Sequence, residues 1–102
     1  MKTQSYEREW IYGYKELLAT EEPGVYKPGR YMHKTEITYK VGEETVCEKS
    51  PYLFVFPRKS NLDSYGNKKK FLVKFRPSDL MNVNSNEFTV RALTIVEELK
   101  GE

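Results

Sequence analysis

A period-two alternation of side chains most constrains what this chain can fold into. In the segment 31–41, every second residue suits a buried face, and the intervening positions are mostly charged or polar. The segment 71–75 repeats the pattern with Phe71, Val73 and Phe75. Successive side chains of a strand point to opposite faces of a sheet, so this period predicts strands with one buried face. We expect a small, mainly β domain built from antiparallel sheet.

The two ends of the chain allow a second interpretation. Residues 1–20 contain apolar residues at helical spacing, but Trp10, Tyr12 and Tyr14 also alternate as in a strand. Residues 88–99 mix helical spacing with β-branched residues, which favour strands. We expect strands at both places, and an α+β domain with terminal helices is the alternative.

The length and composition indicate one ordered domain, 1–102. The chain has 102 residues, which is enough for one hydrophobic core and too few for two. Charged residues make up 31%, but their signs nearly balance, and the net charge is only +2. Aromatic residues make up 14%. Disordered chains are poor in aromatic residues and unbalanced in charge, so this chain should fold.

Short segments of the two halves match in the same order along the chain. The matching pairs are 10–14 with 52–56, 30–34 with 70–74, and 45–46 with 89–90. They predict an internal repeat with units 6–49 and 52–99; chance matching of alternating strands is the other interpretation. Two similar β units would pack side by side and leave a groove between them. An extended peptide could bind in that groove by adding as a strand.

The residue types of common catalytic and metal sites are scarce. Cys47 is the only cysteine and His33 the only histidine, whereas a structural zinc site takes four such ligands. The sequence has no glycine-rich phosphate-binding motif. We expect Cys47 to be a small buried hydrophobe and His33 to be structural. The predicted class is a protein that is not an enzyme and has no metal and no cofactor.

The sequence also predicts where the protein resides. No apolar run approaches the ~20 residues of a membrane helix. The first residues lack the apolar segment of a signal peptide. We expect a cytoplasmic protein without membrane association.

The aromatic residues carry the first functional hypothesis. Eight Tyr, five Phe and one Trp are more than the core of so small a domain encloses. Tyr and Trp are enriched at interfaces because each combines apolar area with a polar group. We therefore expect a non-enzymatic protein-interaction module that binds a protein or peptide partner, with a homo-oligomer also compatible. The candidate contacts are Trp10, Tyr12, Tyr14, Tyr52, Phe54 and Phe56.

A basic stretch, 58–76, carries the alternative hypothesis. Its only acidic residue is Asp63, and Tyr65, Phe71 and Phe75 lie among the cations. Single-strand binding requires cations for phosphates and rings for bases. The alternative function is therefore binding of single-stranded nucleic acid. The basic residues are Arg58, Lys59, Lys68, Lys69, Lys70, Lys74 and Arg76.

The overall composition suggests an origin. Lys and Glu are abundant, Gln occurs once, and no Asn-Gly pair is present. This balance is typical of hyperthermophile proteins. With its small size and many Tyr residues, the chain resembles the small orphan proteins of filamentous viruses of hyperthermophilic archaea. The resemblance implies a viral accessory protein that stays in the host cytoplasm.

Overall fold

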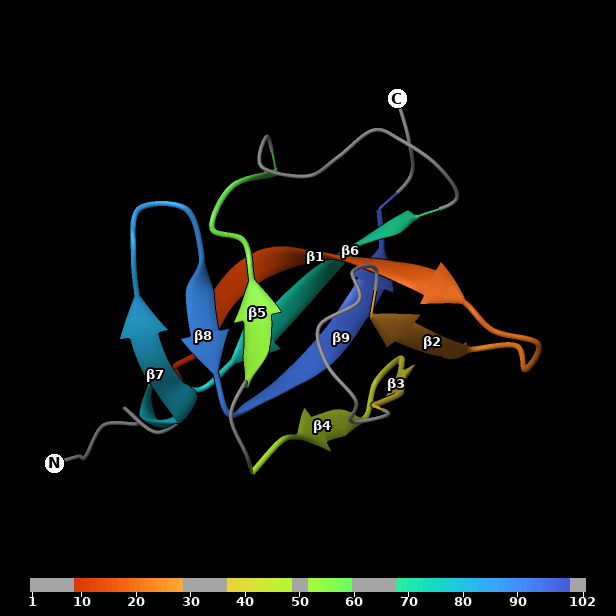
Figure 1. Ribbon diagram of the computed structural model, residues 1–102, viewed down its shortest axis with the longest axis horizontal. Helices are drawn as coiled ribbons and strands as arrows, with labels where there is room; N and C mark the ends of the chain where they lie inside the picture. The colour runs from red at the N-terminus through yellow and green to blue at the C-terminus, as the bar shows by residue number, and fades with distance from the viewer. Residues whose placement is uncertain (1–8, 29–36, 49–51, 60–67, 100–102) are drawn as a thin grey trace, which may run out of the picture.

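The computed structural model describes residues 9–28, 37–48, 52–59 and 68–99, and they form antiparallel sheets with almost no helix (Figure 1). The strands are β1 (Ile11–Ala19), β2 (Val25–Pro28), β3 (Tyr39–Lys40), β4 (Glu44–Val46), β5 (Leu53–Val55), β6 (Lys69–Phe75), β7 (Leu80–Val83), β8 (Phe88–Val90) and β9 (Ala92–Glu98). One short 3₁₀ helix, η3 (Pro77–Asp79), links β6 to β7. The predicted mainly β, antiparallel fold is confirmed. Both ambiguous ends are strands where they are described, so the terminal helices of the alternative are absent there.

Six strands form a sheet that curls until its edges nearly meet. Their order is β3-β2-β1-β6-β9-β4, and the long strands β1, β6 and β9 occupy the middle. The two edge strands, β3 and β4, are joined by a short turn. In that turn Gly42 adopts φ +85°, and its N–H donates to the carbonyl of Ile95 at 2.9 Å. This bond ties the turn to β9 and brings the two edges of the sheet together.

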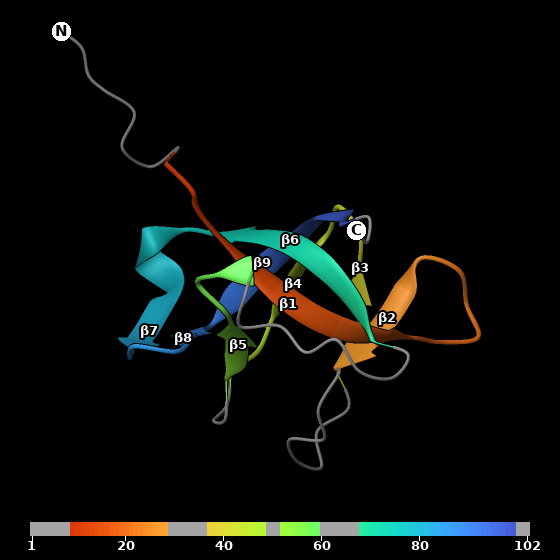
Figure 2. The same ribbon diagram turned by 90° about the horizontal axis from the view of Figure 1, so that it is seen from above.

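A three-stranded sheet, β5-β8-β7, continues from the curled sheet and covers its interior. Tyr14 and Phe56 exchange two backbone hydrogen bonds of 2.8 Å, which attach the end of β5 to β1. Figures 1 and 2 both show β5 lying against β1. A single residue, Arg91, separates β8 from β9, so the chain passes from one sheet to the other at a corner.

The close approach of β5 to β1 depends on Gly13. An added Cβ atom at this position would overlap Val55 Cγ1 and would lie 2.9 Å from the carbonyl oxygen of Phe56. Glycine weakens a strand, but here it permits two backbones to come together. Gly13, which lies within the aromatic segment 10–14, therefore marks a contact between the two sheets.

The core lies between the two sheets and contains the alternating side chains of β6. Phe71, Val73 and Phe75 are buried, as their spacing predicts. Edge-to-face ring contacts join Phe71 to Tyr26 on β2 and Phe75 to Phe88 on β8, with centroid distances of 4.7 and 5.7 Å. These contacts connect β6 to one strand of each sheet.

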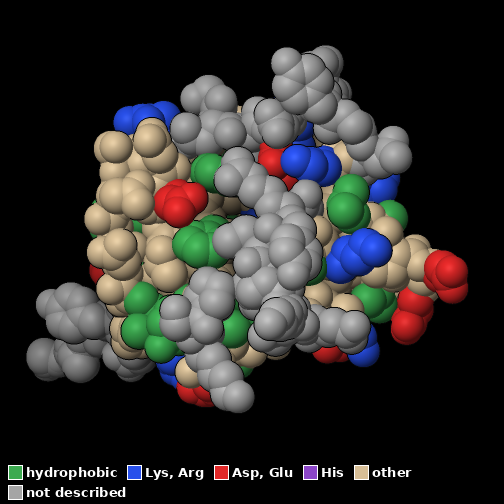
Figure 3. All heavy atoms as spheres, in the orientation of Figure 1, with side chains coloured by type: hydrophobic (Ala, Val, Ile, Leu, Met, Phe, Trp, Pro, Cys, Tyr) green, Lys and Arg blue, Asp and Glu red, His purple; other side chains and the backbone are tan. Residues whose placement is uncertain are grey.

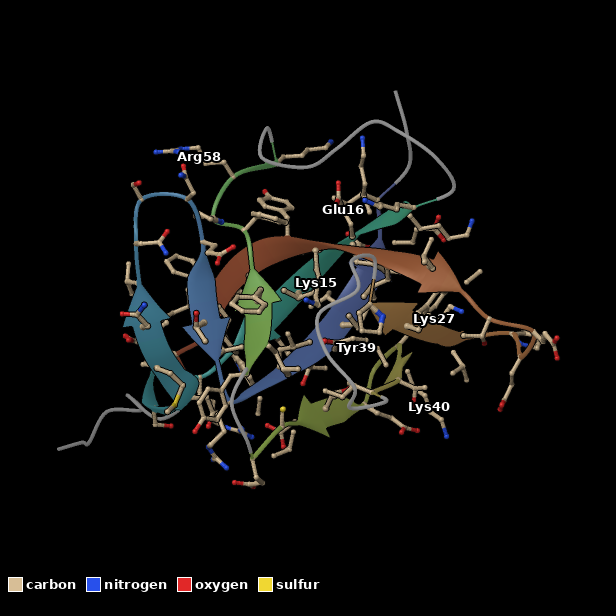
Figure 4. The ribbon with its side chains drawn as sticks, viewed as in Figure 1. Lys15, Glu16, Lys27, Tyr39, Lys40 and Arg58 are labelled. Carbon is tan, nitrogen blue, oxygen red and sulfur yellow. The ribbon has the colours of Figure 1, made fainter. Side chains whose placement is uncertain are left out.

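Cys47 is buried in this core, which confirms the prediction for it. Lys15 is buried as well, and it was not expected there. Its ammonium group donates to the carbonyl of Phe54 at 2.5 Å and lies 5.4 Å from the ring centroid of Tyr39 (Figure 4). A charge on the inner face of β1 is compensated by a β5 carbonyl and an aromatic ring.

The two predicted repeat units contribute strands to the same sheet. Strands β6 and β9, from the range 52–99, lie between β1 and β4, from the range 6–49. Both ranges therefore build one continuous sheet, and the groove between two halves stays a prediction. Part of the matching pattern, 30–34, lies outside the described residues, so the repeat in the sequence stays a prediction.

We predict that Gly13→Ala lowers the free energy of unfolding by about 3 kcal/mol, because the new methyl group forces β5 away from β1. Gly42→Ala is the matched control. Its Cβ meets nothing within 4 Å, so only the positive φ contributes, at about 1 kcal/mol. Denaturant unfolding of both variants measures the difference. An equal or smaller loss for Gly13→Ala would show that the two backbones are not in contact there.

Burial raises the pKa of the Tyr39 hydroxyl far above its usual value, and the charge of Cys47 adds to the effect. Above pH ~10 the unfolded chain loses this proton while the native state keeps it. The free energy of unfolding is therefore unaffected by this group below that pH. Above it, the free energy of unfolding falls by about 1.4 kcal/mol per pH unit. We predict that Tyr39→Phe removes this alkaline decline in urea unfolding. Parallel pH profiles for the two proteins would contradict this assignment.

Candidate interaction surface

The outer face of the curled sheet gathers aromatic and basic side chains from β1 and β6. Tyr12 lies directly opposite Lys74 in the β1–β6 register, and Lys74 lies opposite Thr94 on β9. Thr94 in turn lies opposite Glu44 on β4. Directly opposite residues share a face. Because the neighbours of Lys74 on β6 are buried in the core, this row of side chains faces outward.

Trp10 lies beside this row, just before β1, and two cations lie over its indole ring. Lys74 Nζ is 4.3 Å from the ring centroid, and Arg76 Cζ is 5.0 Å from it. Both distances are within the range of a cation–π interaction. Tyr12 has 52% of its surface exposed, whereas Trp10 is half-buried. We call Trp10, Tyr12, Lys74 and Arg76 the Trp10 surface; half-buried Tyr14 continues the same face of β1.

A cluster of ion pairs holds Arg76 in place. Its guanidinium lies 2.7 Å from a carboxylate oxygen of Glu44 and 3.7 Å from one of Asp79. The Asp79 side chain is only 4% exposed and also pairs with Arg91 at 2.9 Å. Arg91 in turn contacts Glu48 at 3.2 Å. Because Asp79 is almost fully buried, its pairs are screened less by solvent than exposed ones.

The remaining basic residues of 58–76 lie elsewhere. Arg58 and Lys59 are exposed and follow β5, and Figure 4 labels Arg58 at the upper margin of the view. Lys68, Lys69 and Lys70 lie at the start of β6, about 13–20 Å along the strand from Lys74. Lys69 pairs with Glu98 at 3.6 Å. Residues 60–67, with Asp63 and Tyr65, lie outside the described residues. The stretch is therefore divided among three places.

The other predicted aromatic contacts lie around β5, where Phe56 pairs with Tyr14 of β1 through the backbone. Tyr52, Phe54 and Phe56 are half-buried around β5, in the smaller sheet. Of the six aromatic candidates, only Trp10 and Tyr12 lie beside basic side chains of β6 in the described contacts.

Sequence reasoning missed the ion-pair cluster, which joins Glu44, Asp79 and Arg91 to Arg76. These residues come from three distant segments, and no spacing rule relates them. His33 lies outside the described residues. Among the residues that the structure describes, no three His, Cys, Asp or Glu side chains gather as a metal site would require.

A shallow, open depression of about 630 Å³ lies at the turn between β1 and β2. Small-molecule sites are mostly apolar and aromatic. This lining carries charges of both signs and no aromatic ring, so it lacks the character of such a site. It is lined by Ala19, Thr20, Glu21, Glu22, Val25, Lys27 and Thr38.

Comparison of the chain with protein-family models, with curated proteins and with solved structures found no match. The compositional resemblance to viral proteins therefore stays a prediction, as does the cytoplasmic location. Within the described part of the chain, no helix is long and apolar enough to span a membrane.

We predict that Asp79→Asn lowers the free energy of unfolding by about 2 kcal/mol, because it leaves Arg91 and Arg76 without their buried counter-charge. The matched control is Glu48→Gln. It removes a partner of the same Arg91, but the Glu48 side chain is 70% exposed. An exposed pair contributes less than about 1 kcal/mol, so the control should change little. Equal effects in urea unfolding would contradict the buried role of Asp79.

Proposed function

We propose that the protein is a non-enzymatic protein-interaction module and that the Trp10 surface contacts the partner. The observation that carries this proposal is the position of the Trp10 ring under Lys74 and Arg76, beside the exposed Tyr12. Trp, Tyr and Arg are the residue types that dominate binding energy at protein interfaces. The role requires no catalytic chemistry.

The rigidity of this surface supports the proposal. Tyr12 and Lys74 lie on paired strands in the middle of the sheet, and Arg76 is held by Glu44 and Asp79. Side chains that are ordered before binding lose less entropy when the partner arrives. Because β6 is paired with both β1 and β9, a partner reaches its side chains and not its backbone. We infer that recognition here is by side-chain packing and not by strand addition.

The charge distribution favours a protein partner over single-stranded nucleic acid. Glu44 lies against Arg76 on the surface, and Glu98 pairs with Lys69. Carboxylates at these positions would repel phosphates. The other cations of 58–76 are spread over separate places, and the net charge of +2 is low for a nucleic-acid-binding domain. Nucleic-acid binding by this stretch stays the alternative prediction.

We predict that Tyr12→Ala weakens partner binding about thirtyfold, the effect of losing about 2 kcal/mol at an interface hot spot. The partner is captured on the immobilised protein from an extract of the cells that make it, and is then titrated in purified form. The fluorescence of Trp10, the only tryptophan, reports binding. Val41→Ser is the control, because Val41 is 44% exposed at the β3–β4 turn and is not one of the residues of the Trp10 surface.

Two outcomes would contradict the proposal. One is a captured partner whose affinity falls equally for Tyr12→Ala and Val41→Ser. The other is tight binding of a single-stranded oligonucleotide that weakens steeply with added salt and is lost in the Lys68→Glu, Lys69→Glu, Lys70→Glu triple variant. Release of counterions from phosphates produces that salt dependence, so the second result would establish the alternative function.

A further inference from the structure

We propose that β7 is a dimerisation edge, and that β7 of a second copy pairs with it antiparallel about a two-fold axis. This strand ends the three-stranded sheet, and β8 is its only partner among the described strands. Figure 1 places β7 at the outer margin of the molecule. A sheet edge presents a row of backbone N–H and C=O groups that can pair with another strand.

The other sheet edges are engaged within the chain. β3 and β4 meet through the turn that binds Ile95, so the curled sheet nearly closes on itself. β5 is attached to β1 through Tyr14 and Phe56. In the part of the chain that the structure describes, β7 is left as the edge with no such contact. A single open edge among the described strands, paired with its own copy, gives a closed pair and not a filament.

The side chains of β7 are those of a strand that can be covered. Met81 is 47% exposed and Val83 is 55% exposed, although both are large and apolar. Solvent-exposed edges usually carry Lys or Pro, and Leu80–Val83 contains neither a charge nor a proline. Figure 3 shows this margin as mainly uncharged side chains and backbone.

The pattern of β7 fits a second copy of itself. A two-fold axis at Asn82 places Met81 of one copy opposite Val83 of the other, and the reverse on the far side of the axis. Both exposed apolar side chains thus acquire an apolar cross-strand neighbour, which stabilises antiparallel pairs. Because the strand carries no charge, the pairing places no like charges opposite each other.

Both ends of β7 are anchored, so the edge is ordered before it pairs. At its start, Asp79 is held by Arg91 through the side chain and through a backbone hydrogen bond of 2.8 Å. At its end, the Asn84 side chain accepts from the backbone N–H groups of Asn86 and Glu87 at 2.8 and 2.9 Å. An irregularity between Leu80 and Asn82 interrupts the pairing with β8.

A pair of four-residue strands buries less area than the ~1,200–2,000 Å² of stable complexes. The dimer should therefore be weak and dependent on concentration. Sedimentation velocity of the full chain over roughly 10 µM to 1 mM tests this, a range that spans weak dissociation constants. We predict a weight-average mass that rises toward the dimer. Val83→Lys should weaken dimerisation at least about tenfold, because a lysine on each copy meets the apolar edge of the other.

Val41→Lys is the matched control, since it places the same charge on another exposed valine, and it should dimerise like the wild type. Met81→Lys provides a second variant at the edge. Circular dichroism and thermal unfolding establish that each variant is folded. A wild type that stays monomeric throughout the range, or dimerisation unchanged in both β7 variants, would overturn the proposal. Amide hydrogen exchange on β7 provides a further check. If only a different bound protein, and not a second copy, slowed this exchange, the edge would belong to another partner and self-pairing would be contradicted.

Discussion

The buried carboxylate of Asp79 is the interaction on which the rest of this structure depends. It follows β6 and precedes β7, and it binds the guanidinium of Arg91 at the corner where the chain changes sheets. Its backbone carbonyl also accepts from the Arg91 N–H at 2.8 Å. The corner between the two sheets is a single residue, and the ion pair and the backbone hydrogen bond to Asp79 fix its position.

The same carboxylate connects the fold to both proposed binding regions. Through Arg76, whose guanidinium also pairs with Glu44, it helps to hold a cation over the ring of Trp10. On its other side it fixes the start of β7. The Trp10 surface and the β7 edge therefore share a support while using different chemistry: side-chain recognition on a closed sheet face, and backbone pairing at an open edge.

The strands of this fold could be predicted from the sequence more completely than their order in the sheets. The alternation of Phe71, Val73 and Phe75 reports which face of a strand is buried, and this property is local to the sequence. Neighbours in a sheet need not be close in the sequence: β6 and β9 lie between β1 and β4, an order that no local pattern of the sequence specifies.

The residues of the candidate site could also be predicted more completely than their contacts with one another. Trp10 and the pair Lys74 and Arg76 were each singled out from the sequence, but for different functions. Their contact depends on the register of β1 against β6, which no local pattern specifies. The ion pairs of Asp79 are harder still to predict, because β7 and β8 lie between Asp79 and Arg91 in the chain and no spacing rule relates the two residues.

The most direct test of the central claim is a map of chemical-shift changes on the ¹⁵N-labelled protein as the captured partner is added. The account predicts that the largest changes include the indole N–H of Trp10 and the amides of Tyr12, Lys74 and Arg76. Changes confined to Arg58, Lys59 and 68–70, or to the β5 aromatic residues, would contradict it.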